Sequence, residues 1–250
     1  IIAGVAVIVI LGGFLFVRLG QEPEVAIPTP SPTVSPTSIP TLEPAVTGLA
    51  SVFGQPVDYV LPESSRADIF QAGTININNN NPAKNVLVWA KTPGGQNYRF
   101  SQFLDHFAVS FPINFFPALQ DNDFNLILTK QTEFFDQSGN LIVSPSAEML
   151  LTPKTALAVR VIDTTEALTQ LALWEDTMAE NLTEFYDLPV QIEAPPFLNN
   201  TYQGVAIRFA NFPYPDQAID YAIVTANNGN DYLVIANSRE QMFSIIDKLL

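Results

Sequence analysis

The first 17 residues, Ile1–Val17, form one apolar run with the sequence IIAGVAVIVILGGFLFV and no charged or strongly polar side chain. Arg18 ends the run. As a helix rising about 1.5 Å per residue, it would extend roughly 25 Å, slightly less than the ~30 Å hydrocarbon core of a bilayer. Residues 1–18 therefore predict a transmembrane anchor helix, in contact with the lipid bilayer through residues 1–17, which a few upstream residues would lengthen to a full span.

Two other interpretations of this run compete with the anchor. A cleaved signal peptide needs small residues at a cleavage site before the polar segment, and no clear site of this kind follows the run. The other alternative is a buried helix of a globular core. The anchor is favoured because a helix satisfies all of its own backbone hydrogen bonds in lipid.

Residues 19–47 are predicted to form an extended, disordered stalk. Seven of the 27 residues from Gln21 to Thr47 are Pro, and Ser-Pro-Thr occurs twice. Proline fixes φ and removes an N–H donor, so neither helix nor sheet can propagate here. At about 3.1 Å per residue the segment reaches up to ~80 Å. Such stalks typically hold a domain outside a cell, which predicts a single-pass membrane protein whose C-terminal domain is extracytoplasmic.

Residues 48–250 are the part that can fold, and their charge and composition exclude several kinds of site. They carry 10 basic and 22 acidic residues, a net charge near −12, which argues against a nucleic-acid partner. The absence of Cys excludes disulfides, thiolate zinc sites, iron–sulfur clusters and cysteine nucleophiles. A single His excludes sites that need two imidazoles.

The second half of this region begins with a clear strand and helix. Residues Thr155–Ile162 alternate as a strand, and Asp163 with Glu166 resembles a capping box. The helix that follows is predicted to run to about Tyr186. Its apolar residues form one continuous stripe, with three- and four-residue spacing: Leu171, Trp174, Met178, Leu182 and Phe185.

Three further strands and a helix are predicted after an extended connector, residues 187–200. The strands are 203–212, 217–226 and 231–237, and Asn227-Asn228-Gly229-Asn230 is a hairpin turn between the last two. Ser238 and Gln241 repeat the helix-cap pattern before a C-terminal apolar helix. The order of the second half is therefore strand, long helix, three strands, helix.

The first half is predicted to be a degenerate copy of this unit. Residues 69–77 and 85–90 are expected to be strands, 101–107 a helix, and 124–135 a strand that enters a hairpin at 137–140. The fold class predicted is α+β, with an antiparallel sheet and helices packed on one face. The domain divides into possible halves at 48–154 and 155–250.

Motifs for catalysis are missing from the sequence. No phosphate-binding glycine loop, nucleophile elbow, S-x-x-K pair or H-E-x-x-H motif occurs. His106 lies in FLDHFA without a nearby nucleophile and is expected to be a structural residue at a helix surface or partly buried. The sequence thus predicts no catalytic, cofactor-binding or metal residues and no cofactor, and indicates a protein that is not an enzyme.

Two groups of carboxylates are candidates for a metal or catalytic site. Asp121 and Asp123 open a D-x-D-x-N pattern, but a calcium loop needs Gly at the sixth position and an acid at the twelfth, where Leu126 and Thr132 stand. A turn capped by Asp side chains is expected instead. On the long helix a second group is spaced for one solvated face, without the burial that a catalytic acid needs: Asp176, Glu180, Glu184 and Asp187.

Aromatic residues gather in two proline-rich connectors. Exposed aromatics there could stack on sugar rings or grip a peptide, but such residues more often fold back over the edge of a core. The second outcome is expected. The residues are Phe111, Phe115 and Phe116 in the first connector, and Phe197, Phe212 and Tyr214 in the second.

Several stretches of the last third of the chain carry a resemblance. They include LWEDTM (173–178), APPF (194–197), YQGVAIRFANFP (202–213), IDYAIV (219–224) and YLVIANSREQMFSIIDKLL (232–250). Together with the architecture, they look similar to uncharacterised single-pass anchored proteins of small-genome, uncultured bacteria, which also place a Pro/Ser/Thr stalk after an N-terminal span. The resemblance implies an anchor and a bacterial envelope location, and it implies no site residues.

These features predict a non-enzymatic binding or scaffolding module of the bacterial cell envelope. Its partner is expected to be an envelope protein or a polysaccharide. Two alternatives stay open: a carboxylate-dependent cell-wall or polysaccharide hydrolase, and an extracellular sensor domain. Two carboxyls facing each other in a cleft would favour the hydrolase, and solvent-facing acids would favour the binding module.

Overall fold

A computed structural model describes residues 48–63, 67–189 and 194–250, all within one compact unit. The predicted anchor (1–18) and stalk (19–47) lie outside the described residues. No helix within the described ranges combines the length and the apolar character needed to cross a membrane.

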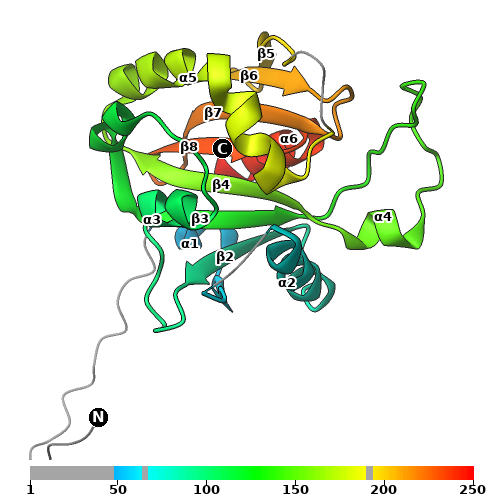
Figure 1. Cartoon of the computed structure of the whole chain (residues 1–250), viewed down its shortest axis with the longest axis horizontal. Helices are drawn as coiled ribbons and strands as arrows, with labels where there is room; N and C mark the ends of the chain where they lie inside the picture. The colour runs from blue at the N-terminus through cyan, green and yellow to red at the C-terminus, as the bar shows by residue number, and fades with distance from the viewer. Residues whose placement is uncertain (1–47, 64–66, 190–193) are drawn as a thin grey trace, which may run out of the picture. The chain divides into compact units, whose positions relative to one another are not determined.

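The described residues form α-helices and strands in a mixed order, with one 3-10 helix, η1 (Figure 1). The elements are α1 (Ala50–Phe53), β1 (Val57–Val60), α2 (Ala67–Asn79), β2 (Asn85–Lys91), α3 (Phe100–His106), η1 (Ile113–Ala118), β3 (Leu119–Thr129), α4 (Ala147–Leu151), β4 (Lys154–Val161), α5 (Thr164–Tyr186), β5 (Leu198–Tyr202), β6 (Val205–Asn211), β7 (Ala218–Thr225), β8 (Asp231–Ala236) and α6 (Arg239–Leu249).

The strands pair into one eight-stranded sheet in the order β1-β2-β3-β4-β8-β7-β6-β5. β1 and β2 are parallel, and all other neighbours are antiparallel. In the centre, Leu157 of β4 lies between Leu126 of β3 and Ile235 of β8. The α+β class is confirmed, but the sheet is mixed rather than antiparallel. The proposed halves 48–154 and 155–250 share this sheet through the β3–β4 pair, and their origin by duplication stays a prediction.

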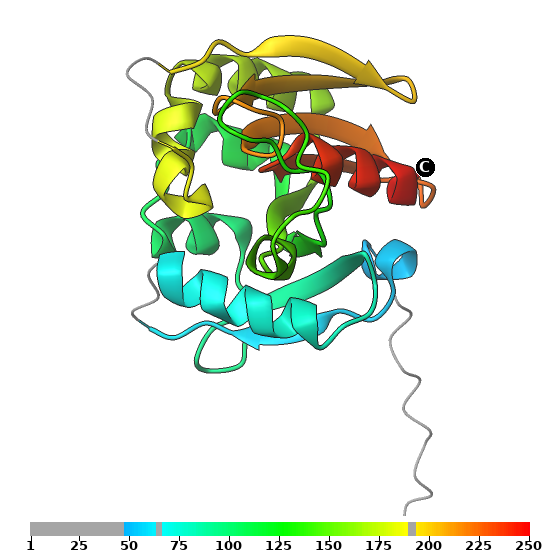
Figure 2. The same cartoon turned by 90° about the vertical axis from the view of Figure 1, so that its right-hand side faces the viewer.

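Helices cover both faces of the sheet, so the prediction of helices on one face is wrong. One core contains buried residues of α2, α3, η1 and α5, whereas the other contains buried residues of α1 and α6. Figures 1 and 2 show α5 and α6 on opposite sides of the sheet. The central strands explain this arrangement, because β4 and β8 are buried along almost their whole length on both faces and need cover on each.

The strand predicted at residues 69–77 is wrong, because this segment is the helix α2. The sequence of this segment alternates between apolar and polar residues, but burial does not follow that alternation. The buried side chains are Phe70, Thr74 and Asn78, which are spaced by four residues as on one face of a helix. Isoleucine and asparagine are weak helix formers, so the packing of this face against the sheet outweighs the local preference.

The two caps of the second half are confirmed. Asp163 accepts a hydrogen bond from the Glu166 backbone N–H at the start of α5, and Ser238 accepts one from the Gln241 N–H at the start of α6. The strands and the turn at 227–230 are confirmed as well. The connector predicted at 187–200 was too long, because its end belongs to the edge strand β5.

Candidate binding cavity

A cavity of about 160 Å³ lies at the end of the sheet where β4 begins and β8 ends. For comparison, an engineered cavity of about 150 Å³ holds one benzene molecule. Polar side chains from several elements line it, together with three aromatic residues. The lining residues are Phe70, Gln71, Thr74, Thr152, Pro153, Lys154, Thr155, Phe185, Tyr186, Asp187, Gln217 and Asn237.

Lys154 is the cation of this cavity. It opens β4 directly after Thr152 and Pro153, and Thr152 has the extended backbone that is favoured before a proline. Within the described residues, its ammonium group has neither a hydrogen bond nor an ion pair. Burial lowers the pKa of Lys154 to about 8, and the carboxylates of Asp216 and Asp187 oppose that shift. The side chain stays partly accessible to solvent, and a cation without a partner beside converging polar groups marks the cavity as a functional candidate.

Asn237 fixes the wall of the cavity between β8 and α6. Its side-chain oxygen accepts a hydrogen bond from the backbone N–H of Thr155, at 3.1 Å. Its own backbone N–H donates to the side-chain oxygen of Gln241 at 3.1 Å, one turn into α6. The residue is 7% exposed, so this wall is held rigidly by the β4–β8 pairing and by the helix cap.

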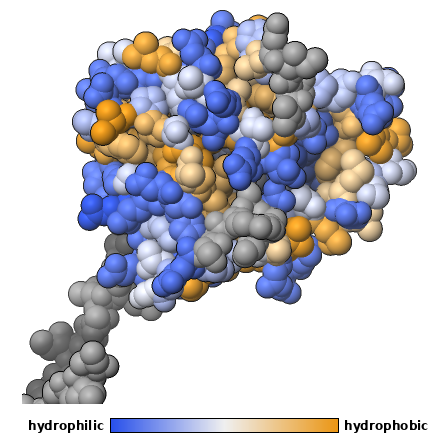
Figure 3. Space-filling model, viewed as in Figure 1, coloured by the Kyte–Doolittle hydropathy of each residue, from blue (hydrophilic) through white to orange (hydrophobic). Residues whose placement is uncertain are grey.

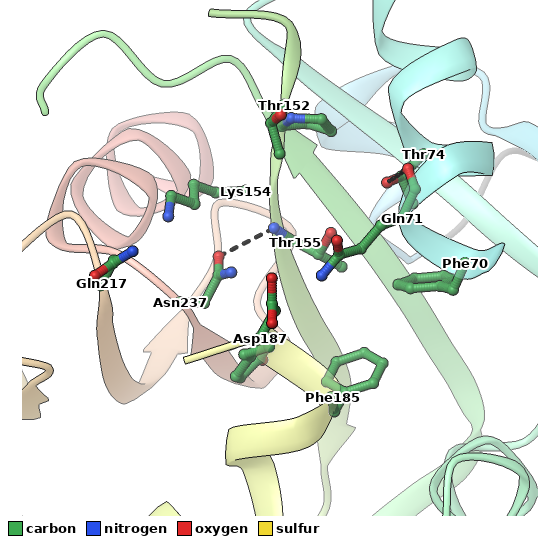
Figure 4. Close-up of a pocket in the computed structure, with 12 residues that line it drawn as sticks. Phe70, Gln71, Thr74, Thr152, Lys154, Thr155, Phe185, Asp187, Gln217 and Asn237 are labelled. Carbon is green, nitrogen blue, oxygen red and sulfur yellow. Dashed lines mark hydrogen bonds between the residues drawn. The ribbon is translucent and has the colours of Figure 1, made fainter. Parts of the chain in front are cut away.

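The remaining walls come from the end of α5 and from α2. Asp187 ends α5 in the left-handed conformation, with φ 51°, and its side chain is exposed to solvent. Phe70 and Phe185 stack at 5.6 Å and form an apolar wall. In Figure 4, Lys154, Gln71, Asp187 and Asn237 surround one space from four different parts of the fold.

The cavity lies at the opposite end of the central strands from the first described residue. The backbone oxygen of Gly48 accepts a hydrogen bond from Asn228, in the turn that joins β7 to β8. Asn237 follows the other end of β8. Six residues of strand, at about 3.3 Å each, separate these ends by roughly 20 Å.

His106 is half-buried at the end of α3, as expected. Its Nδ1 lies 3.1 Å from the hydroxyl of Tyr98, and its Nε2 is buried without a partner in the described structure. Burial lowers the pKa of His106. The imidazole packs against the rings of Tyr98 and Phe107 and lies outside the cavity.

The prediction of a turn at Asp121–Asn125 is wrong. These residues lie within β3, where the register against β4 shifts between Gln120 and Phe124, as in a β-bulge. Asp121 accepts hydrogen bonds from the N–H and the hydroxyl of Ser101, at the start of α3. No group of three or more His, Cys, Asp or Glu side chains is placed to hold a metal ion in the ranges that the structure describes.

The acidic face of α5 is solvated, as predicted: Asp176, Glu180, Glu184 and Asp187 are all exposed. The carboxylate with specific partners on this helix is Glu175, which the sequence analysis missed. It accepts hydrogen bonds from Nε and Nη2 of Arg208 at 2.7 and 2.5 Å, and from the hydroxyl of Tyr221. These contacts tie α5 to β6 and β7.

The aromatic residues of both connectors fold back onto the core, as expected, except for Tyr214. Phe115 is completely buried, Phe212 is 2% exposed, and Phe111 stacks on Phe115 at 4.8 Å. Tyr214 stacks on Phe135 at the base of the segment between β3 and β4. Val143, which at 92% is the most exposed large apolar side chain of the described residues, lies in that same segment, at the right of Figure 1. On the face drawn in Figure 3, hydrophobic residues form separate patches among hydrophilic ones.

Sequence reasoning also missed Lys154 and Asn237. Lys154 had one usable signal, since it is a charged residue between a proline and the mostly apolar stretch TALAV. Asn237 also had a sequence signal, because it is a polar residue directly before the predicted helix cap Ser238. Comparison with known proteins found no matching family model, no matching curated protein and no matching solved structure.

Proposed function

We propose that this chain is a membrane-anchored, extracytoplasmic binding module of the bacterial cell envelope, and that the Lys154 cavity is its recognition site. The observation that carries the proposal is the position of an unpartnered ammonium in a polar cavity at the end of the sheet opposite Gly48. A domain attached through Gly48 would present that cavity away from its attachment point.

The acidic surface supports the same assignment. A net charge near −12 repels anionic headgroups, and a stalk of up to ~80 Å would keep such a domain clear of them. The cavity itself has the character of a binding site, with a few polar groups converging beside an apolar wall.

The hydrolase alternative has less support. Paired catalytic carboxylates need one desolvated member with a raised pKa. The acids predicted on α5 face solvent, and Asp187 is the one carboxylate among the described residues that line the cavity. A sensor would use the same cavity, and a cytoplasmic module upstream of the sequence given would distinguish it from a simple binding module.

Anchoring is tested by detergent phase partition of the full chain. We expect the full chain in the detergent phase and a matched variant with two aspartates in the apolar run, Val7→Asp with Ile10→Asp, in the aqueous phase. Recovery of the unaltered chain in the aqueous phase without detergent would contradict the anchor.

Recognition at the cavity is tested with two variants of α2. Gln71→Trp places a large ring at a lining position, whereas Ala72→Trp places the same ring on the exposed side of the same helix. The full chain in detergent is incubated with a bacterial envelope extract, and bound components are identified by mass spectrometry. We expect a component that the wild type and Ala72→Trp retain and Gln71→Trp loses; equal retention by both variants would contradict recognition at this cavity.

A further inference from the structure

Resting on the proposed function, we propose that the cavity binds a small zwitterion of the α-amino acid class. The carboxylate of the ligand pairs with the ammonium of Lys154, and the ammonium of the ligand pairs with the carboxylate of Asp187.

The ammonium of Lys154 makes no ion pair with a described residue and is available to an anionic group of a ligand. Asp216 and Asp187 influence its pKa, yet neither forms an ion pair with it. A ligand carboxylate would accept a charge-assisted hydrogen bond in that space. The side-chain amides of Gln71 and Gln217 line the same cavity and make no hydrogen bonds within the described residues, so they can donate to the second carboxylate oxygen.

A simple anion fits the charges less well than a zwitterion. Lys154 stands near two carboxylates, Asp187 and Asp216, so the formal charge around the cavity is −1 before any ligand enters, in a domain that is itself acidic. A neutral zwitterion avoids that repulsion, because its ammonium can meet Asp187. Asp187 is exposed and makes no side-chain hydrogen bond within the described residues, which leaves its carboxylate available.

The volume and the apolar wall set the size of the ligand. A cavity of about 160 Å³ accommodates one small molecule. The stacked rings of Phe70 and Phe185 offer an apolar surface beside the polar groups. A short aliphatic or aromatic side chain on the ligand can bury against them.

The test measures binding of L-leucine to the full chain in detergent by isothermal titration calorimetry. Isocaproate, which lacks the ammonium of leucine, and isopentylamine, which lacks its carboxylate, are the matched probes. We expect leucine, or another member of a panel of standard amino acids, to bind at least about tenfold more tightly than either of its truncated analogues, since each analogue loses one charge-assisted contact.

Two variants assign the contacts. Lys154→Met is expected to weaken amino-acid binding about tenfold or more, and Lys248→Met, at the exposed end of α6, to leave it unchanged. Asp187→Asn keeps a residue that tolerates the left-handed conformation and is expected to weaken binding of the amino acid but not of isocaproate. Asp176→Asn, on the exposed face of α5, is the control.

The proposal is overturned if no amino acid of the panel binds at millimolar concentration, if isocaproate binds as tightly as leucine, or if Lys154→Met binds normally. These outcomes are distinct from failure of the proposed function. A polysaccharide or protein retained by the wild type and lost in Gln71→Trp would uphold recognition at the cavity while removing the amino-acid assignment.

Discussion

The hydroxyl of Tyr59 occupies the position that a side chain at Gly73 would need. A Cβ placed on Gly73 would lie 1.9 Å from the Tyr59 hydroxyl oxygen and 2.3 Å from Cζ of the same ring. Tyr59 also packs on Phe70, one turn earlier in α2, with ring centroids 6.0 Å apart. The close approach of β1 and α2 therefore depends on the missing side chain at position 73.

Gly73→Ala is expected to destabilise the protein. In an ordinary helix interior, alanine is about 0.5–1 kcal/mol better than glycine, but overpacking against Tyr59 costs about 1–3 kcal/mol. We expect a net loss measured as a lower urea midpoint. In a Tyr59→Ala background the ring is gone, so Gly73→Ala should become neutral or stabilising; the same loss in both backgrounds would refute the clash.

The Glu175–Arg208 pair is expected to contribute to stability at neutral pH. Burial would raise the pKa of Glu175, but hydrogen bonds from Arg208 and Tyr221 outweigh it and hold the pKa below its usual value. A depressed carboxylate pKa stabilises the fold above the unfolded-state pKa and loses that contribution as the pH falls through the folded-state value.

Glu175→Gln should therefore lower the free energy of unfolding by about 2 kcal/mol at pH 7 and by less at pH 3. Urea denaturation across this range measures the difference, and Glu180→Gln, on the exposed face of the same helix, is the control. A loss that does not shrink in acid would show that the charge of Glu175 is not the cause.

Lys154 is expected to make stability increase with pH on the alkaline side. Its pKa in the folded protein, about 8, is lower than the ordinary value of 10.5. The unfolded chain therefore binds more protons between these values, and the free energy of unfolding rises with pH across that window. Lys154→Met should show a smaller rise than Lys248→Met between pH 8 and pH 10 in chemical denaturation. Parallel curves for the two variants would contradict this assignment.

Asp220 is expected to have the opposite effect from Lys154, because it should make the free energy of unfolding fall as the pH rises. It lies in β7 at 2% exposure, and one of its carboxylate oxygens is buried without a hydrogen-bond partner in the described structure. Burial raises its pKa to about 8, against the opposing charge of Arg239. A raised carboxylate pKa means that stability is greatest below the unfolded-state value near 3.8 and is lost as the pH rises toward 8.

Asp220→Asn removes this ionisation while it keeps the shape of the side chain. We expect the variant to gain on the order of 2 kcal/mol over the wild type at pH 8, and to be close to it at pH 4. Thermal or urea unfolding at the two pH values is the measurement. A variant that is less stable than the wild type at pH 8 would show that the ionised carboxylate has a stabilising partner.

Local sequence signals were sufficient to predict a helix or a turn where the interactions lie within that one element. Asp163 and Ser238 stand at helix starts because their side chains accept backbone N–H groups three residues later, and this chemistry is visible without any tertiary contact. The apolar stripe of α5 and the Asn-Gly turn before β8 belong to the same class. The structure confirms all of these elements.

Only the tertiary structure decided the features that join distant parts of the chain. The segment 69–77 is a helix because packing against β1 outweighs weak local preferences, and the sheet is covered on both faces because β4 and β8 are buried on both. The cavity is the clearest case, since Gln71, Lys154, Asp187 and Asn237 lie far apart in sequence and meet where strands and helices end. Capping and periodicity are short-range interactions that one stretch of sequence contains. The pairing of strands and the loss of solvent around an amine, in contrast, depend on which surfaces the whole chain brings together.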